Sequence, residues 1–184
     1  MRIYFSGAHS VGKSTLARYV SQKCNLPMLS EAARQILSEQ ELQIDNLRSD
    51  LDMTDKYQRQ VFDRQLEEER KYQSFVSDRS ALDVLAYSAQ HSRILPELIK
   101  SPELNSYLAI LHEPESIIFF VRPCKATLKA DGVREVINWT GVVAIDAQIK
   151  FALEMFGLRY FQINTESMQE RVSIIESILS TMSS

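Results

Sequence analysis

Short apolar runs alternate with longer segments of helical periodicity along the whole chain. Runs of about four to eight apolar residues are typical of strands that are buried on both faces. The clearest run spans 117–121, where every residue is apolar. Five strands are therefore predicted, at residues 2–6, 27–30, 74–78, 116–122 and 159–163.

The segments between these strands carry apolar residues at helical spacing, and several begin with a capping pattern. Ser80 and Asp83 have the spacing of a capping box, as do Ser167 and Glu170. Ser101 precedes a proline, which is favoured at the first helical position. Helices are predicted over 13–24, 31–48, 54–72, 80–91 and 101–112. Another helix is predicted after a polar loop that ends at about residue 135; it runs through Asp146 and Phe156 and ends at Gly157, and a last helix follows residue 167.

Alternating strands and helices predict an α/β fold, in which a five-stranded parallel sheet has helices on both faces. A length of 184 residues is typical of one domain, so a single domain over 1–184 is expected. Parallel sheets bind ligands beyond the carboxyl ends of their strands. The chemistry is therefore expected near Ser6, Ser30, Asp78 and Arg122.

The composition is typical of a folded protein without disulfide bonds, with 45% hydrophobic and 24% charged residues and a net charge of -3. Cys24 and Cys124 form neither a disulfide framework nor a metal-binding spacing. No apolar run approaches the roughly 18 residues of a membrane span, and the N-terminus lacks a signal-peptide pattern. A cytoplasmic protein without a membrane partner is expected, and the slightly acidic charge gives no indication of bulk nucleic-acid binding.

A complete phosphate-binding pattern, G-x-x-x-x-G-K-[ST], follows the first predicted strand. In such a loop, backbone N–H groups and the start of the next helix bind nucleotide phosphates. We expect Lys13 to contact the β- and γ-phosphates of ATP or GTP, and Ser14 to ligate Mg²⁺. The predicted phosphate-binding residues are Gly7, Ala8, His9, Ser10, Val11, Gly12, Lys13, Ser14 and Thr15.

Missing motifs disfavour two classes of P-loop hydrolase. The chain has neither the Asp-x-x-Gly nor the Asn-Lys-x-Asp pattern of GTPases, and no Asp-Glu dipeptide of the kind that activates water in ATPase motors. Instead, Asp78-Arg79-Ser80 follows the third predicted strand. Asp78 is predicted to hold Mg²⁺, and Arg79 to bind the acceptor or the transferred phosphate. In the alternative interpretation Asp78 is a loop residue and Ser80 only a helix cap.

Glu31 comes just after the second predicted strand, where a carboxylate could accept the proton of an attacking hydroxyl. Arg34, about one helical turn later, would share the face of Glu31 and could pair with it or bind substrate. The competing explanation is that an acidic residue is simply favourable in the first turn of a helix.

Cationic residues are concentrated after the fourth predicted strand, at Arg122, Lys125, Lys129 and Arg134, and only Asp131 opposes them. A loop of this kind can close over phosphates and exclude water, so Arg134 is predicted to stabilise transition-state charge. A solvated charged loop is the alternative.

Taken together, the motifs resemble small P-loop kinases of the nucleoside and nucleotide kinase type, and among them the bacterial and phage family related to the ribosylnicotinamide kinase domain of NAD regulators. The resemblance rests on 7–14, Glu31-Ala32-Ala33-Arg34, Asp78-Arg79-Ser80, the stretch from Asp83 to Tyr87, and Asp131-Gly132-Val133-Arg134. It implies a three-layer P-loop fold with strand order 2-3-1-4-5, a lid at about 123–135, and a bacterial or phage-infected cytoplasm.

The resulting interpretation is an Mg²⁺-dependent kinase that transfers the γ-phosphoryl of ATP to a hydroxyl of a nucleoside- or nucleotide-type acceptor. Its predicted catalytic residues are Lys13, Glu31, Asp78 and Arg134. Because some similar phage kinases act on hydroxymethylated pyrimidines, DNA is an alternative acceptor. A non-catalytic, nucleotide-dependent regulatory module is the other alternative, and a homodimer is left open.

Overall fold

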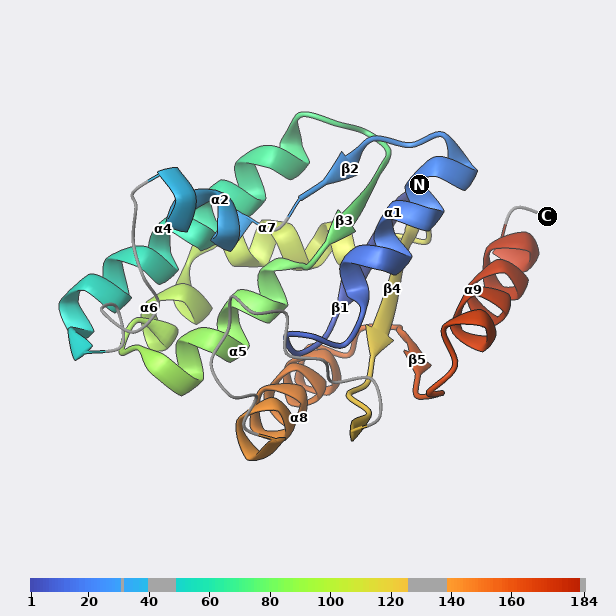
Figure 1. The fold of residues 1–184 in the computed structure, drawn as a ribbon. Helices are drawn as coiled ribbons and strands as arrows, with labels where there is room; N and C mark the ends of the chain where they lie inside the picture. The colour runs from blue at the N-terminus through green and yellow to red at the C-terminus, as the bar shows by residue number, and fades with distance from the viewer. Residues whose placement is uncertain (31, 40–48, 126–138, 183–184) are drawn as a thin grey trace.

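The computed structural model describes residues 1–30, 32–39, 49–125 and 139–182. Its centre is a parallel sheet with the strand order β2-β3-β1-β4-β5, which confirms the predicted order (Figure 1). The strands are β1 (Arg2–Ser6), β2 (Met28–Leu29), β3 (Phe75–Asp78), β4 (Ser116–Val121) and β5 (Phe161–Ile163). All five predicted strands are therefore present, with slightly different ends.

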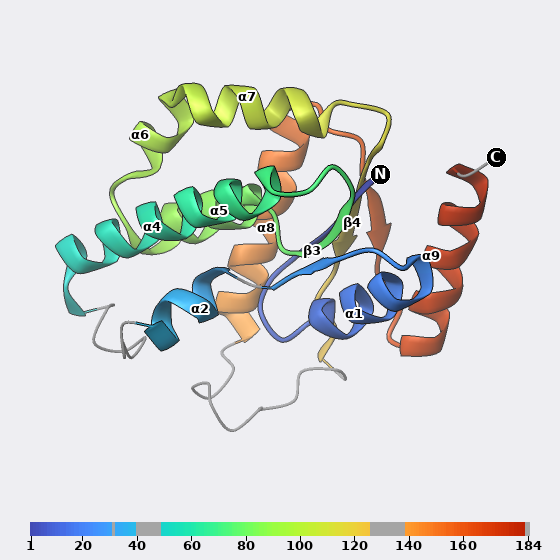
Figure 2. The same ribbon diagram turned by 90° about the horizontal axis from the view of Figure 1, so that it is seen from above.

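Helices cover both faces of this sheet, as the alternating pattern predicts (Figure 2). One face carries α1 (Lys13–Cys24) and α9 (Met168–Met182), and the other carries α4 (Leu51–Arg70), α5 (Ala81–His91), α7 (Pro102–Leu111) and α8 (Trp139–Met155). Two shorter helices, α2 (Ala32–Glu39) and α6 (Leu95–Lys100), lie in the connections. Within the described ranges, no helix combines the length and apolarity needed to cross a membrane.

Strand β4 lies between β1 and β5, and all of its residues are buried. This double-sided burial explains why its sequence is continuously apolar rather than alternating. The register pairs Phe5 with Asp78 and Ser6 with Phe120, so β1, β3 and β4 end at the same edge of the sheet. The phosphate-binding loop and Asp78 therefore come from neighbouring strand ends.

Some helix ends differ from the prediction for local reasons. The Asp50 side chain accepts the backbone N–H groups of Asp52 and Met53, so α4 begins at residue 51 rather than 54. The short helix α6 was not predicted, because it spans less than two turns and shows little periodicity. The predicted helix 31–48 is confirmed over Ala32–Glu39, and its remaining residues lie outside the described part.

The two predicted capping boxes have different outcomes. At the start of α5, the Asp83 carboxylate accepts the Ser80 backbone N–H at 2.9 Å, and the capping box is complete. At the start of α9, Ser167 Oγ accepts the Glu170 N–H at 3.3 Å, but the Glu170 carboxylate bonds to the Thr165 hydroxyl instead of the Ser167 backbone. The second capping box is therefore only half formed.

Candidate active site

The loop between β1 and α1 has the backbone conformation of a phosphate-binding loop. Gly7, Ser10 and Gly12 all have positive φ angles, of 153°, 59° and 93°. Where residues with positive φ alternate with residues of negative φ, successive backbone N–H groups turn toward a common concavity. Phosphate-binding loops bind anions in this way. A Cβ atom on Gly7 would lie only 2.4 Å from the Val121 carbonyl oxygen, so glycine is required where the loop packs against the end of β4.

Lys13 is the first residue of α1, and its side chain folds back over this loop. It is only 5% exposed, and its Nζ donates a hydrogen bond of 2.5 Å to the Ala8 carbonyl. In the same first turn of α1, Ser14 is half-buried and Thr15 is exposed. The loop therefore brings the predicted lysine and hydroxyl groups to one end of α1, as the pattern predicts.

Asp78 ends β3 and is 4% exposed. Its Oδ1 atom has no hydrogen-bond partner among the described residues. A buried carboxylate oxygen without a partner is unfavourable, and a hard cation is a suitable partner for it. No group of three His, Cys, Asp or Glu side chains that could hold a metal occurs in the described ranges. Asp78 and Ser14 thus fit Mg²⁺, which commonly takes its remaining ligands from water and phosphates.

Arg79 has a backbone conformation that is rare for a residue with a side chain, with φ of 109°. Such conformations are concentrated at active sites, where the surrounding structure enforces them. Here the Arg79 N–H donates to the Phe5 carbonyl at 3.1 Å. The guanidinium group lies 3.7 Å from Asp83 and 5.1 Å from the centre of the Tyr87 ring, so it is buried against α5.

Asp83 accepts several hydrogen bonds at the site, and sequence reasoning assigned it only a capping role. It is fully buried. One carboxylate oxygen accepts the Gly7 N–H at 2.9 Å, and the other accepts the Ser6 hydroxyl at 2.6 Å and the Ser80 hydroxyl and N–H at 2.9 Å. Asp83 therefore joins the start of the phosphate-binding loop to the segment that carries Asp78 and Arg79.

His9 provides a second link between the loop and α5, because its Nδ1 lies 3.2 Å from the Tyr87 hydroxyl. Arg34 is exposed on α2. Glu31 and Arg134, the predicted base and the predicted lid residue, lie outside the described residues.

Part of the cationic segment after β4 has a structural role. Arg122 forms a two-point ion pair with Asp146 of α8, with distances of 3.0 Å from Nε to Oδ1 and 2.8 Å from Nη2 to Oδ2. Burial raises the pKa of Asp146, and the Arg122 charge opposes that increase. The Lys125 ammonium lies 5.3 Å from the centre of the Trp139 ring. Arg122 is therefore engaged with α8 rather than directed to phosphates.

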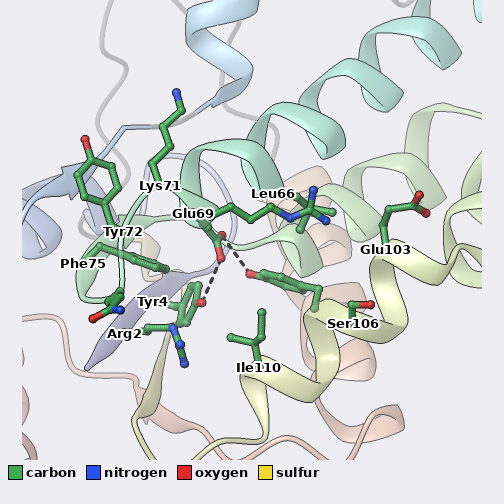
Figure 3. Close-up of a pocket in the computed structure, with 13 residues that line it drawn as sticks. Arg2, Tyr4, Leu66, Glu69, Lys71, Tyr72, Phe75, Glu103, Ser106 and Ile110 are labelled. Atoms are coloured by element: carbon green, nitrogen blue, oxygen red, sulfur yellow. Dashed lines mark hydrogen bonds between the residues drawn. The ribbon is translucent and has the colours of Figure 1, made fainter.

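A buried polar network supports the Asp78–Ser80 segment from behind, and its centre is Glu69 of α4 (Figure 3). Glu69 accepts hydrogen bonds from the Tyr4 hydroxyl at 3.0 Å, the Tyr107 hydroxyl at 3.2 Å and Gln65 Nε2 at 2.7 Å. One bond then reaches the end of β3, because Gln65 Nε2 also donates to Ser77 Oγ at 3.1 Å. Another reaches the start of α5, because Tyr107 accepts the backbone N–H of residue 81 at 3.3 Å. The network thus holds both flanks of the predicted metal- and substrate-binding segment.

The network also forms part of the lining of a cavity of about 300 Å³ between β1, β3, α4 and α7 (Figure 3). None of the predicted site residues within the described ranges lines this cavity. Arg2, at the start of β1, is among its lining residues, whereas the phosphate-binding loop follows the opposite end of that strand. The cavity is therefore separate from the candidate active site.

Glu69 makes the stability of the fold depend on pH in a defined direction. Burial raises the pKa of Glu69 from its ordinary value of 4.5 to about 7, although hydrogen bonds from Gln65, Tyr4 and Tyr107 oppose this shift. Between these two values the folded chain holds a proton that the unfolded chain has lost, so the free energy of unfolding falls as pH rises. We expect Glu69 to contribute a loss of about 3 kcal/mol between pH 4 and 8.

Urea denaturation of the wild type and Glu69→Gln at several pH values measures this contribution. The wild type is expected to lose more stability than the variant as pH rises, because glutamine does not ionise. Parallel pH curves for the two proteins would show that Glu69 ionises normally in the folded state.

Comparisons with known proteins agree with this fold. The structure is similar to NadR protein in complex with NR, with a TM-score of 0.78 and 18% identity, over 100% of this chain and 52% of that one. It is similar to deoxyadenosine kinase from M. mycoides with bound dATP, with a TM-score of 0.65 and 15% identity, over 98% of this chain and 100% of that one. It is also similar to shikimate kinase from Aquifex aeolicus, with a TM-score of 0.59 and 16% identity, over 98% and 96% of the two chains.

At these identities the similarity establishes the shared fold, and the chain spans about half of the NadR chain. The three-layer P-loop fold inferred from the motifs is thereby confirmed. None of the curated proteins compared with the sequence matches it. A family model described as AAA domain matches residues 2–171, which include every site residue discussed above. Since this match covers most of the sequence, the chain belongs to that AAA domain family.

Proposed function

We propose that this chain is an Mg²⁺-dependent kinase that transfers the γ-phosphoryl of ATP to a hydroxyl of a nucleoside- or nucleotide-type acceptor. One observation carries the proposal. A phosphate-binding loop with its lysine folded over it follows β1, and the neighbouring β3 ends in a buried carboxylate oxygen that has no partner in the described residues. A phosphate cradle beside a cation ligand is what phosphoryl transfer requires.

The loop residues bind the phosphates through their N–H groups, and Lys13 supplies positive charge to the transferred group. Ser14 and Asp78 hold Mg²⁺, which neutralises charge on the phosphate oxygens when it is bound. Arg79 is already oriented by Asp83 and by the ring of Tyr87, so it can bind an acceptor without first being ordered. Arg134 and Arg34 are proposed to bind the transferring group and the acceptor.

The nature of the acceptor is supported by the similar structures. Two of them are a deoxyadenosine kinase and a NadR protein in complex with NR, whereas the shikimate kinase is less similar by TM-score. A nucleoside or nucleotide acceptor is therefore the preferred class. The absence of GTPase and motor motifs favours transfer to an acceptor over hydrolysis by water.

A panel of acceptors tests this proposal. The protein is incubated with Mg²⁺ and ATP, or with GTP in parallel, together with nucleosides, nucleotides, shikimate or hydroxymethylated DNA. ADP formation that requires a nucleoside or nucleotide supports the proposal, and mass spectrometry identifies the phosphorylated product. ADP formation that depends on shikimate or on DNA, and not on a nucleoside or nucleotide, would show that the acceptor belongs to a different class. ADP formed at the same slow rate with every acceptor would instead indicate a regulatory module.

Glu31 is proposed to be the general base, because in the sequence it comes two residues after the end of β2, and β2 pairs in parallel with β3, which ends in Asp78. A general base contributes roughly 10²–10⁴-fold to rate, so Glu31→Gln is expected to lower transfer to a hydroxyl by about that factor. The affinity for ATP is expected to stay the same, as measured by titration calorimetry.

Glu39→Gln is a matched control, because Glu39 is an exposed carboxylate on α2 that pairs with Arg64. It is expected to retain the wild-type transfer rate. A Glu31→Gln variant with a near-normal rate would contradict the base assignment, and would be the result expected if the acceptor were itself a phosphate.

A further inference from the structure

Arg171 of α9 is a fully buried arginine that contacts the phosphate-binding loop from behind. Its Nη1 donates a hydrogen bond of 2.6 Å to the Val11 carbonyl, and its Nε donates one of 2.6 Å to the Thr165 carbonyl. A Cβ atom placed on Gly12 would lie 3.6 Å from Nη1. The guanidinium group is therefore packed directly against the loop.

The charge of Arg171 has no compensating carboxylate in the described part of the chain. Both of its partners are neutral backbone carbonyls, and its Nη2 atom has no hydrogen-bond partner among the described residues. Burial lowers the pKa of Arg171, which is the expected effect of removing a cation from water. Buried cations are normally paired, because an unpaired one is costly. A negative charge on the other side of the loop would offset this cost.

We propose that Arg171 is a positioning residue of the phosphate-binding loop, and that its buried charge favours ligands with several phosphate groups. The proposal rests on the proposed nucleotide-binding function. By holding the Val11 carbonyl outward, Arg171 leaves the N–H groups of the loop free to face the ligand. Its charge then adds to the positive potential of the loop, with an effect that increases with the negative charge of the phosphates.

A purely structural role for Arg171 is the alternative, because it also joins α9 to the rest of the chain. A second contact between the same helices distinguishes the two roles. Glu176 of α9 bonds to Lys23 and to Tyr19 of α1 at the surface, well along the helix from the loop. Lys23→Met removes a contact between α1 and α9 without altering the loop, so it is the matched control.

Calorimetric titration of the full chain with Mg²⁺ and ATP, ADP or AMP provides the test. Arg171→Met is expected to lower the affinity for ATP by about 10–100-fold, which corresponds to the loss of a hydrogen bond from a charged group. The affinity for ADP should fall less, and the affinity for AMP should change least. Lys23→Met should bind all three within about twofold of the wild type, as expected for an exposed ion pair.

Arg171→Lys keeps the charge but cannot reach both carbonyls, so it should recover part of the ATP affinity. If Arg171→Met does not fold, as judged by circular dichroism, the comparison of Arg171→Lys with the wild type is sufficient. Equal losses for the three ligands, or no loss, would overturn the proposal. A wild type that binds ATP with these preferences but transfers no phosphoryl group would contradict the kinase function alone.

Discussion

Replacing Asp78 with asparagine is expected to lower the rate of phosphoryl transfer by about 10³-fold, the scale of removing one preorganised electrostatic group. The substitution keeps the shape of the side chain and removes the negative charge that would hold Mg²⁺ at the end of β3. The fold should be retained, because Oδ1 of Asp78 makes no hydrogen bond within the described residues that the amide would break. Initial rates at saturating ATP over an Mg²⁺ titration measure the effect.

Asp63→Asn on α4 is the control for this variant, since the Asp63 side chain is 44% exposed and pairs with Arg59. It should transfer phosphate at the wild-type rate with the same Mg²⁺ dependence. If Asp78→Asn keeps a rate within about tenfold of the wild type and responds to Mg²⁺ in the same way, Asp78 is not a metal ligand.

Replacing Asp83 with alanine is expected to lower the free energy of unfolding by about 3–5 kcal/mol, as for removal of one partner from a buried charged network. Without the Asp83 carboxylate, the N–H groups of Gly7 and Ser80 and the hydroxyls of Ser6 and Ser80 have no acceptor in a fully buried position. The first glycine of the phosphate-binding loop is released as well, so ATP affinity should fall. Urea denaturation and calorimetry measure the two effects.

The corresponding surface substitution is Asp52→Ala. Asp52 pairs with Arg93, but its side chain is 80% exposed, and such pairs contribute little. Its effect on unfolding should stay within about 1 kcal/mol of the wild type. A loss of less than about 1 kcal/mol for Asp83→Ala would mean that water replaces the missing carboxylate, and that Asp83 does not tie the loop to β3.

The sheet and the phosphate-binding loop could be predicted because their signals are local. The continuous apolarity of β4 reports its burial on both faces, and Gly7 and Gly12 occur where the backbone needs positive φ. Asp78 could be placed because strand order and strand ends follow from the α/β pattern once the motifs identify the family. These features depend on residues close to one another in the sequence.

The supporting residues could not be predicted, because their partners are distant in the sequence. Arg171 bonds to a carbonyl 160 residues away, and Tyr4 bonds to Glu69, 65 residues away. Asp83 carried a capping signal, but nothing in that spacing indicates its bond to Gly7. For Arg122 the charge pattern suggested a phosphate contact, whereas in the structure it pairs with Asp146 of α8. Glu31 and Arg134 remain predictions from the sequence.

The fate of the γ-phosphoryl group tests the kinase proposal most directly. ATP labelled at the γ position is mixed with Mg²⁺, the full chain and the acceptor identified in the panel, and the label is followed over time. The proposed function predicts that most of the label reaches the acceptor, and that Lys13→Met stops this transfer. Label that appears only as inorganic phosphate, at a rate unaffected by the acceptor, would contradict it.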